Sequence, residues 1–124
     1  MGFTRGDIVY VADDPSDDAI GSEQWSGRYA VIVSCNVINL YSPNVIIAYT
    51  TTRHGVKYTS QFATNSTPES STVMCECVRA VSKQRVQRCR MRLTKAEIQE
   101  LDKALAVSMG LAGYWEEDGN GTTD

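Results

Sequence analysis

One arginine of this chain stands between a polar loop and an apolar segment. Arg28 precedes the run Tyr29-Ala30-Val31-Ile32-Val33. The loop before it supplies a hydroxyl, a carboxylate and an amide, from Ser22, Glu23 and Gln24. If the apolar segment is a buried strand, the strand fixes the direction of the guanidinium, which can contact two oxygens of one anion. A rigidly held cation beside a polar loop indicates a binding or catalytic site.

A second group of cations lies nearer the C-terminal end of the sequence. It has no acidic residue within it and consists of Arg79, Lys83, Arg85, Arg88, Arg90, Arg92 and Lys95. Such a run is typical of a surface that meets phosphates or an acidic peptide. The net charge is −3, but four carboxylates lie beyond Trp115, so the preceding residues carry a slight positive excess. A solvated face balanced by this acidic tail is an equally open interpretation.

Runs of β-branched and aromatic residues predict the strands that position these side chains. We expect strands over residues 7–12, 27–35, 44–52, 56–63, 72–78 and 86–93, with 36–43 and 65–71 as connections. The strand 27–35 is apolar on both faces, which indicates a central place in the sheet. The more polar strand 56–63 is expected at an edge.

Two of these strands carry charged or sulfur-containing side chains that segregate to one face. Within 86–93, three arginines alternate with apolar side chains, which predicts a half-buried strand with a cationic outer face. Within 72–78, Glu76 shares a face with Met74 and Val78, whereas Cys75 and Cys77 share the other.

The strongest local pattern predicts a helix over residues 95–109. Thr94 and Glu97 have the spacing of a capping box, and Gly110 supplies the stop. Four apolar residues keep helical spacing, namely Ile98, Leu101, Leu105 and Met109.

Length and composition favour one small domain. With 124 residues and 42% apolar content, the chain can bury a modest core without metal or disulfide staples. The predicted fold class is mainly β, a β-rich α+β chain with a small, strongly bent antiparallel sheet or partial barrel capped by the C-terminal helix. No apolar leader or run of roughly 18 apolar residues is visible, so we expect a cytoplasmic protein that does not enter membranes and keeps its cysteines reduced.

Beyond these patterns, the chain resembles the MazF/PemK/Kid family of toxin endoribonucleases. The similarity extends from residue 5 to 111 in order and spacing. The segments that carry it are Arg5-Gly6-Asp7-Ile8-Val9-Tyr10, Gly21-Ser22-Glu23-Gln24 followed by Arg28, Asn39, Ser42-Pro43, the strand ending at Thr51, Cys75-Glu76-Cys77-Val78-Arg79, Lys83-Gln84-Arg85, the Leu93-Thr94-x-x-Glu97 helix start and Met109-Gly110-Leu111.

The resemblance implies an SH3-like barrel over residues 1–111, followed by an acidic tail, 112–124, that we expect to be disordered. It further implies a homodimer that cuts single-stranded RNA without metal or cofactor. The ribose 2′-hydroxyl would attack the adjacent phosphate, which leaves a 2′,3′-cyclic phosphate and a 5′-hydroxyl. A cognate antitoxin with an acidic, extended tail would occupy the RNA groove, and the pair would bind DNA.

Site residues follow from the same resemblance. The implied catalytic residues are Arg28, Thr51 and Glu76, the last either contacting a base or acting on the proton. RNA-contacting positions are Ser22, Glu23 and Gln24 in the loop, with Arg79, Arg88 and Arg90 from the cationic group. Because arginine stays protonated at its usual pKa, charge stabilisation by Arg28 is favoured over proton transfer.

Several residues have plainer interpretations. Arg28 alone would most often be a solvated charge or a salt-bridge partner, Thr51 an ordinary strand residue and Glu76 a surface carboxylate. His54 is interpreted as a turn residue, and the four cysteines as buried thiols because their spacing does not match a zinc site.

The sequence also departs from the family pattern around Arg28. Tyr29 replaces a common proline and Gly27 directly precedes the arginine, so loop geometry is expected to differ. Met74 and Ser22 replace residues proposed as catalytic in one branch, and Cys77 stands where many members have glutamine. Alternatives to an active ribonuclease are a non-enzymatic, CcdB-like gyrase poison, a silent nucleic-acid-binding barrel and an antitoxin binder whose catalysis has decayed.

Overall fold

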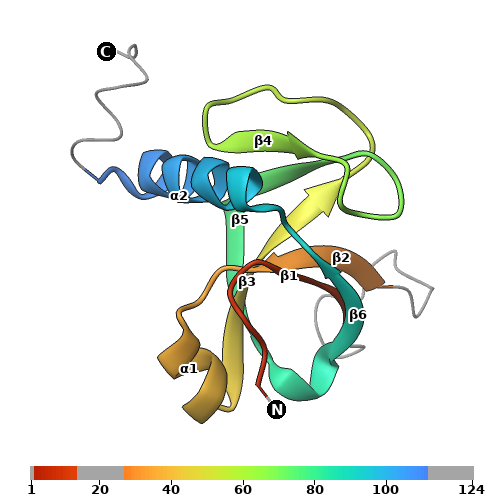
Figure 1. The fold of residues 1–124 in the computed structure, drawn as a ribbon, viewed down its shortest axis with the longest axis vertical. Helices are drawn as coiled ribbons and strands as arrows, with labels where there is room; N and C mark the ends of the chain where they lie inside the picture. Colours follow the sequence, from red (N-terminus) through yellow and green to blue (C-terminus); the bar gives the residue numbers. More distant parts are fainter. Residues whose placement is uncertain (1, 14–26, 112–124) are drawn as a thin grey trace.

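The computed structural model describes residues 2–13 and 27–111. Its six strands form one antiparallel sheet in the order β4-β5-β3-β2-β1-β6 (Figure 1). The elements in chain order are β1 (Asp7–Ala12), β2 (Gly27–Ile32), α1 (Asn36–Tyr41), β3 (Asn44–Thr51), β4 (Gln61–Thr64), β5 (Ser71–Ser82), the 3-10 turn η1 (Lys83–Arg85), β6 (Val86–Arg92) and α2 (Lys95–Met109).

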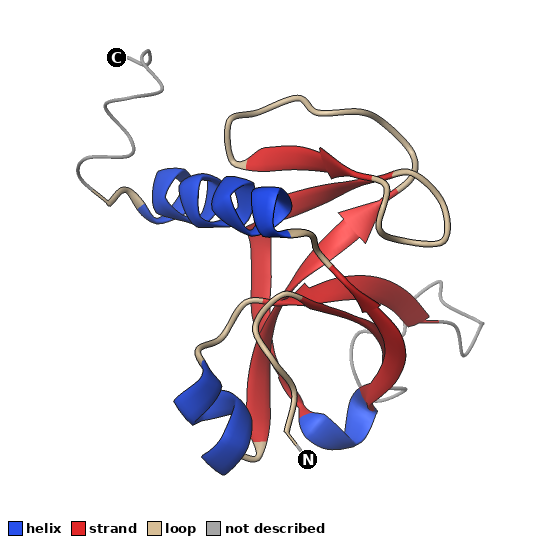
Figure 2. Ribbon diagram, in the orientation of Figure 1, coloured by secondary structure: helices blue, strands red, loops and turns tan. Residues whose placement is uncertain are grey.

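The sheet is strongly bent but not closed, because β4 and β6 are its two edges (Figure 2). Strand β2 is central and sends alternate side chains into two cores. Val31 belongs to the core that includes Leu101 of α2, whereas Ala30 and Ile32 belong to the other core, with Ile47. These observations confirm the predicted mainly β fold with its bent sheet and C-terminal helix, and the predicted edge position of β4.

Helix α2 forms as predicted. Thr94 Oγ1 accepts from the backbone N–H of Glu97, and the Glu97 carboxylate accepts from the backbone N–H of Thr94. Gly110 ends the helix in the left-handed conformation, with φ of 70°. The helix contacts β4 and β5, and an ion pair of 2.8 Å between Arg5 and Asp102 ties it to the chain before β1.

The predicted connection 36–43 is wrong in part, because α1 occupies residues Asn36–Tyr41. This short helix has no side-chain bond at its N-cap, Cys35, and no acidic residue in its first turn. Its anchor is Asn39, which is fully buried and donates to the carbonyl of Ser34 at 2.9 Å. Burial of a hydrogen-bonded Asn39, rather than capping signals at the helix ends, therefore stabilises this helix.

Three strand predictions also need correction. The predicted strand 27–35 is too long, since β2 ends at Ile32. The polar strand is shorter than the predicted 56–63, since β4 begins only at Gln61. Strand β5 is longer than 72–78 and continues to Ser82, so Arg79 lies within it. The register of β5 against β3 slips, because Ala48 pairs with Val78 whereas Thr50 pairs with Val73. This irregularity frees residues 74–77 from β3.

The slip brings these residues toward β4. Met74 pairs with Gln61, and the backbone N–H of Cys75 donates to the Ser60 carbonyl at 2.9 Å. The predicted burial of the thiols holds for Cys75 but is wrong for Cys77, which is exposed, as is Cys35. No helix in the described part of the chain is long and apolar enough to cross a membrane.

Candidate active site

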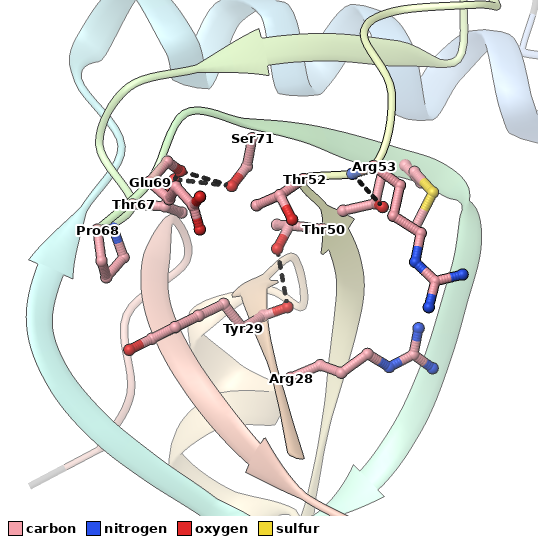
Figure 3. Close-up of a pocket in the computed structure, with 11 residues that line it drawn as sticks. Arg28, Tyr29, Thr50, Thr52, Arg53, Thr67, Pro68, Glu69 and Ser71 are labelled. Carbon is pink, nitrogen blue, oxygen red and sulfur yellow. Dashed lines mark hydrogen bonds between the residues drawn. The ribbon is translucent and has the colours of Figure 1, made fainter. Parts of the chain in front are cut away.

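A pocket of about 580 Å³ opens where β2 begins and β3 ends (Figure 3). It brings together two of the three predicted catalytic residues, Arg28 and Thr51. The loop between β4 and β5 supplies its far wall. The full lining consists of Arg28, Tyr29, Thr50, Thr51, Thr52, Arg53, Thr67, Pro68, Glu69, Ser71 and Met74.

The start of β2 is fixed by aromatic contacts with β1. The backbone N–H of Gly27 donates to the Tyr10 hydroxyl at 2.9 Å, and the rings of Tyr10 and Tyr29 meet edge to face with centroids 5.1 Å apart. A Cβ at Gly27 would collide with the Val11 carbonyl oxygen. Glycine before Arg28 and tyrosine after it, both departures from the family pattern, therefore serve to hold Arg28 at this position.

The guanidinium of Arg28 lies over the ring of Tyr49, 4.0 Å from its centroid. Tyr49 pairs with Ala30 across the β2–β3 ladder, and Arg28 is two residues before Ala30 on the same face. A diagonal neighbour of this kind is within reach of long side chains. A cation over an aromatic face is stabilised electrostatically, so buried Tyr49 orients Arg28. Sequence reasoning missed this residue.

The threonines at the end of β3 have different partners. Thr50 is buried, and its hydroxyl donates to the Tyr29 carbonyl at 3.1 Å, which gives it a structural role. The Thr51 hydroxyl oxygen instead accepts from the backbone N–H of Arg53 at 3.1 Å. Its own proton therefore points elsewhere, which leaves Thr51 able to donate into the pocket.

Arg53 is a second cation at this end of the pocket. Figure 3 shows its guanidinium beside that of Arg28. Within residues 2–13 and 27–111, neither guanidinium forms an ion pair. Two like charges repel unless an anion lies between them, so the arrangement favours anion binding. Sequence reasoning placed Arg53 in a turn, and its position two residues after Thr51 is the only signal that could have found it.

Glu76, the third predicted catalytic residue, is absent from the lining of this pocket. Its carboxylate accepts from the Ser60 hydroxyl at 2.8 Å and from the Gln61 amide at 2.6 Å. Burial raises the pKa of Glu76, but hydrogen bonds from Gln61, Ser60 and its own backbone, together with the nearby His54, outweigh this effect and lower it. Glu76 is thus an oriented, ionised carboxylate that does not line the pocket.

Cys77 lies near both Glu76 and Arg28. Burial raises the pKa of the Cys77 thiol, the Glu76 charge raises it further, and the Arg28 charge opposes both. His54 lies in the turn that sequence reasoning assigned to it, with Nδ1 2.8 Å from the Gly55 carbonyl oxygen.

The predicted RNA-binding arginines lie elsewhere. Arg79 is an exposed residue of β5 opposite Ile47. Arg88 and Arg90 line a different pocket, of about 340 Å³, between β1 and β6. The Arg88 guanidinium lies 4.5 Å from the centroid of the Phe3 ring.

Arg90 has a left-handed backbone, with φ of 60°, and is the only non-glycine residue with positive φ in the described part of the chain. The β1–β6 register slips here, since Ile8 pairs with Met91 whereas Val9 pairs with Arg88. Cys89 and Arg90 therefore form a bulge. The loop residues Ser22, Glu23 and Gln24, also predicted to contact RNA, lie outside the described residues.

Comparison with known proteins gives a consistent result. A family model described as "PemK-like, MazF-like toxin of type II toxin-antitoxin system" matches residues 4–109. The structure is similar to an endoribonuclease from a mycobacterial species solved with its cognate antitoxin, at 23% identity and a TM-score of 0.71, covering 88% of this chain and 96% of that one.

Two further solved structures share the fold. MazE–MazF from Deinococcus radiodurans is 16% identical with a TM-score of 0.73, covering 90% of this chain and 99% of that one. The Mycobacterium tuberculosis toxin MazF-mt6 is 17% identical with a TM-score of 0.66, covering 83% and 96%. Because the family model spans most of the sequence, this chain belongs to the PemK-like, MazF-like toxins of type II toxin–antitoxin systems.

Proposed function

We propose that this toxin is an endoribonuclease that cuts single-stranded RNA at short sequences by attack of the ribose 2′-hydroxyl on the adjacent phosphate. The observation that carries the proposal is that Arg28, Thr51 and Arg53 line the same pocket of about 580 Å³. Support also comes from the mycobacterial relatives, whose structures are named endoribonucleases.

The reaction forms a bond between the 2′-oxygen and phosphorus and breaks the bond between phosphorus and the 5′-oxygen. The products are a 2′,3′-cyclic phosphate and a 5′-hydroxyl. Negative charge grows on the non-bridging oxygens as the phosphorane forms. The guanidinium groups of Arg28 and Arg53 and the hydroxyl of Thr51 are donors that stabilise this charge, and Tyr49 fixes the first of them before substrate arrives.

The proton of the 2′-hydroxyl needs an acceptor, and the departing 5′-oxygen needs a donor. Arginine is a weak candidate for either step because it stays protonated. A lowered pKa also makes Glu76 a weaker base than an ordinary carboxylate. We therefore assign Glu76 its other predicted role, contact with a nucleobase of the RNA. Stabilisation of the phosphorane charge is then the main contribution of the protein.

Because two guanidinium groups supply positive charge at the phosphate, the proposed reaction needs no metal.

Residues 1–111 form the toxin domain in this proposal, and the acidic segment 112–124 follows it. The protein acts in the cytoplasm as a homodimer, and a cognate antitoxin inhibits it through an acidic, extended segment. The mycobacterial relative solved in complex with its cognate antitoxin supports an antitoxin as the partner.

The test is cleavage of a diverse single-stranded RNA pool by purified protein in the presence of a chelator. We expect 2′,3′-cyclic ends that disappear with Arg28→Ala. Arg92→Ala is the matched control, because Arg92 is paired with Asp7 at 3.5 Å on another surface and should leave cleavage at saturating RNA unchanged. No cleavage of any RNA by the wild type, or equal cleavage by Arg28→Ala, would falsify the proposal.

A further inference from the structure

The candidate active-site pocket has opposite charges at its two ends. Arg28 and Arg53 lie at one end, and Glu69 lies at the other, on the loop between β4 and β5 (Figure 3). Thr50 and Thr52 lie between them. Glu69 forms no ion pair with any residue that the structure describes. Its carboxylate is therefore available to a ligand that enters the pocket.

The backbone that carries Glu69 is held firmly. The hydroxyls of Thr67 and Ser71, both buried, donate to the Glu69 carbonyl at 2.6 and 2.8 Å. Pro68 restricts the backbone immediately before it. The loop is further anchored to α2, because the Glu97 carboxylate accepts from Ser66 at 2.7 Å. Since these bonds use the carbonyl of Glu69, they fix its backbone and leave its exposed carboxylate free to contact a ligand.

A carboxylate in a phosphate-binding pocket weakens RNA binding by repulsion unless it gains a contact in return. Bases of single-stranded RNA present hydrogen-bond donors on their free edges. We propose that Glu69 is a specificity-determining residue that reads a guanine base of the RNA while Arg28 and Arg53 hold a phosphate. This inference rests on the proposed function, which supplies the RNA.

Guanine fits a carboxylate better than the other bases. Its N1–H and N2–H donors lie side by side and match the two carboxylate oxygens. Adenine and cytosine place an acceptor nitrogen next to their amino group, and uracil places its single N–H between two carbonyl oxygens. One oxygen of Glu69 would therefore face an acceptor with any base other than guanine.

The experiment measures binding of two fully 2′-O-methylated RNAs, pentauridylate and the same RNA with one central guanine. Methylation removes the nucleophile, so binding is measured without cleavage. We expect the wild type to prefer the guanine-containing RNA by about 5- to 150-fold, the range of a good bidentate base contact. Glu69→Gln should weaken binding of that RNA and strengthen binding of pentauridylate, because the negative charge is lost.

Glu100→Gln, an equal change of charge on the exposed surface of α2, is the control and should preserve the preference. A uniform gain of affinity with Glu69→Gln would show that Glu69 only repels RNA and would overturn the inference. An unchanged preference, or no binding of either RNA by the wild type, would overturn it as well. A guanine preference without cleavage of unmodified RNA would retain the inference and reject the proposed chemistry.

Discussion

Two arginine-rich surfaces of this toxin differ in what their arginines contact. In the candidate active-site pocket, Arg28 stacks on a buried ring and Arg53 lies beside it, and neither has an ion-pair partner in residues 2–13 and 27–111. On β6, Arg92 pairs with Asp7 and donates to the Arg5 carbonyl, and Arg88 donates to the Gly2 carbonyl at 3.2 Å.

The comparison teaches that density of charge along a sequence is a poor guide to a binding site. In the denser group, on β6, Arg88 and Arg92 use hydrogen-bond donors to hold the N-terminal segment in place. The pair in the pocket is separated by 25 positions in sequence and is joined only by the β2–β3 ladder. What distinguishes the pocket is two neighbouring cations, one of them oriented by a ring, a geometry suited to one phosphate.

The largest expected effect separates the two surfaces directly. Arg53→Ala should lower the cleavage rate constant by about 10²- to 10³-fold, because a charged donor to the phosphorane is lost. Arg88→Ala should mainly weaken RNA binding and reduce its salt dependence. Single-turnover cleavage at several salt concentrations measures both. Equal losses of rate in the two variants would remove the distinction.

The second prediction concerns adjacent threonines of β3. Thr51→Val should lower the cleavage rate constant by about 10²-fold through loss of its hydroxyl. Thr50→Val should leave the rate nearly unchanged and lower the free energy of unfolding by about 1 kcal/mol, because its bond to the Tyr29 carbonyl is lost. Chemical denaturation of both variants provides the control. The reverse pattern would place the reacting phosphate nearer to Thr50.

A smaller effect on cleavage is expected from substitution of Tyr49, whose ring lies beneath Arg28. Tyr49→Leu should reduce cleavage by about 2- to 30-fold, the range of a cation–π contact, and Tyr49→Phe should restore most of it. Saturating kinetics should show the change in kcat rather than in KM, since Tyr49 positions a residue and does not touch RNA. No rescue by phenylalanine would argue for a role of the hydroxyl instead.

On β6, substitution of Arg90 should change the free energy of unfolding. Arg90→Gly should raise the free energy of unfolding by about 0.5 kcal/mol, because glycine relieves the left-handed strain but loses more chain entropy on folding. Arg90→Ala keeps the strain and serves as the comparison. If both variants lose RNA affinity while only the glycine variant is stabilised, Arg90 contributes to binding despite its distance from the pocket lining.

The smallest expected effect concerns the acidic end of the chain. Deleting residues 112–124 removes four carboxylates, so RNA binding to the cationic surface should strengthen by a few-fold at low salt and be unchanged at high salt. Affinity measured at both salt concentrations tests this. Unchanged binding at low salt would show that the tail does not screen the β6 arginines.

Local patterns were sufficient for much of the fold. The capping box of Thr94 and Glu97 defined α2, and alternation defined the outer arginines of β6. Features that depend on buried contacts or on strand pairing were missed. Helix α1 is anchored by buried Asn39, and the register slip at Tyr49 follows from the pairing of β3 with β5, neither of which leaves a periodic trace in the sequence.

The same limit applies to the site. Resemblance to a family selected Arg28 and Thr51, which the structure places around one pocket. Tyr49, Arg53 and Glu69 were missed because an aromatic in a strand and charged residues in turns are common in any sequence. Arg53 and Glu69 are relevant because they line the pocket, and Tyr49 because its ring lies against Arg28, and only the fold determines these relations. The roles of all five residues remain predictions for the experiments above.

The bent sheet ends in two edge strands, and β6 is one of them. Arginine occupies three of its seven positions, and the bulge at Arg90 interrupts its ladder. Charged side chains and bulges are features by which natural sheets avoid pairing with the edges of other molecules. The β6 arginines thus also affect solubility, independently of RNA. Their charges disfavour polymerisation of toxin molecules in solution through this strand edge.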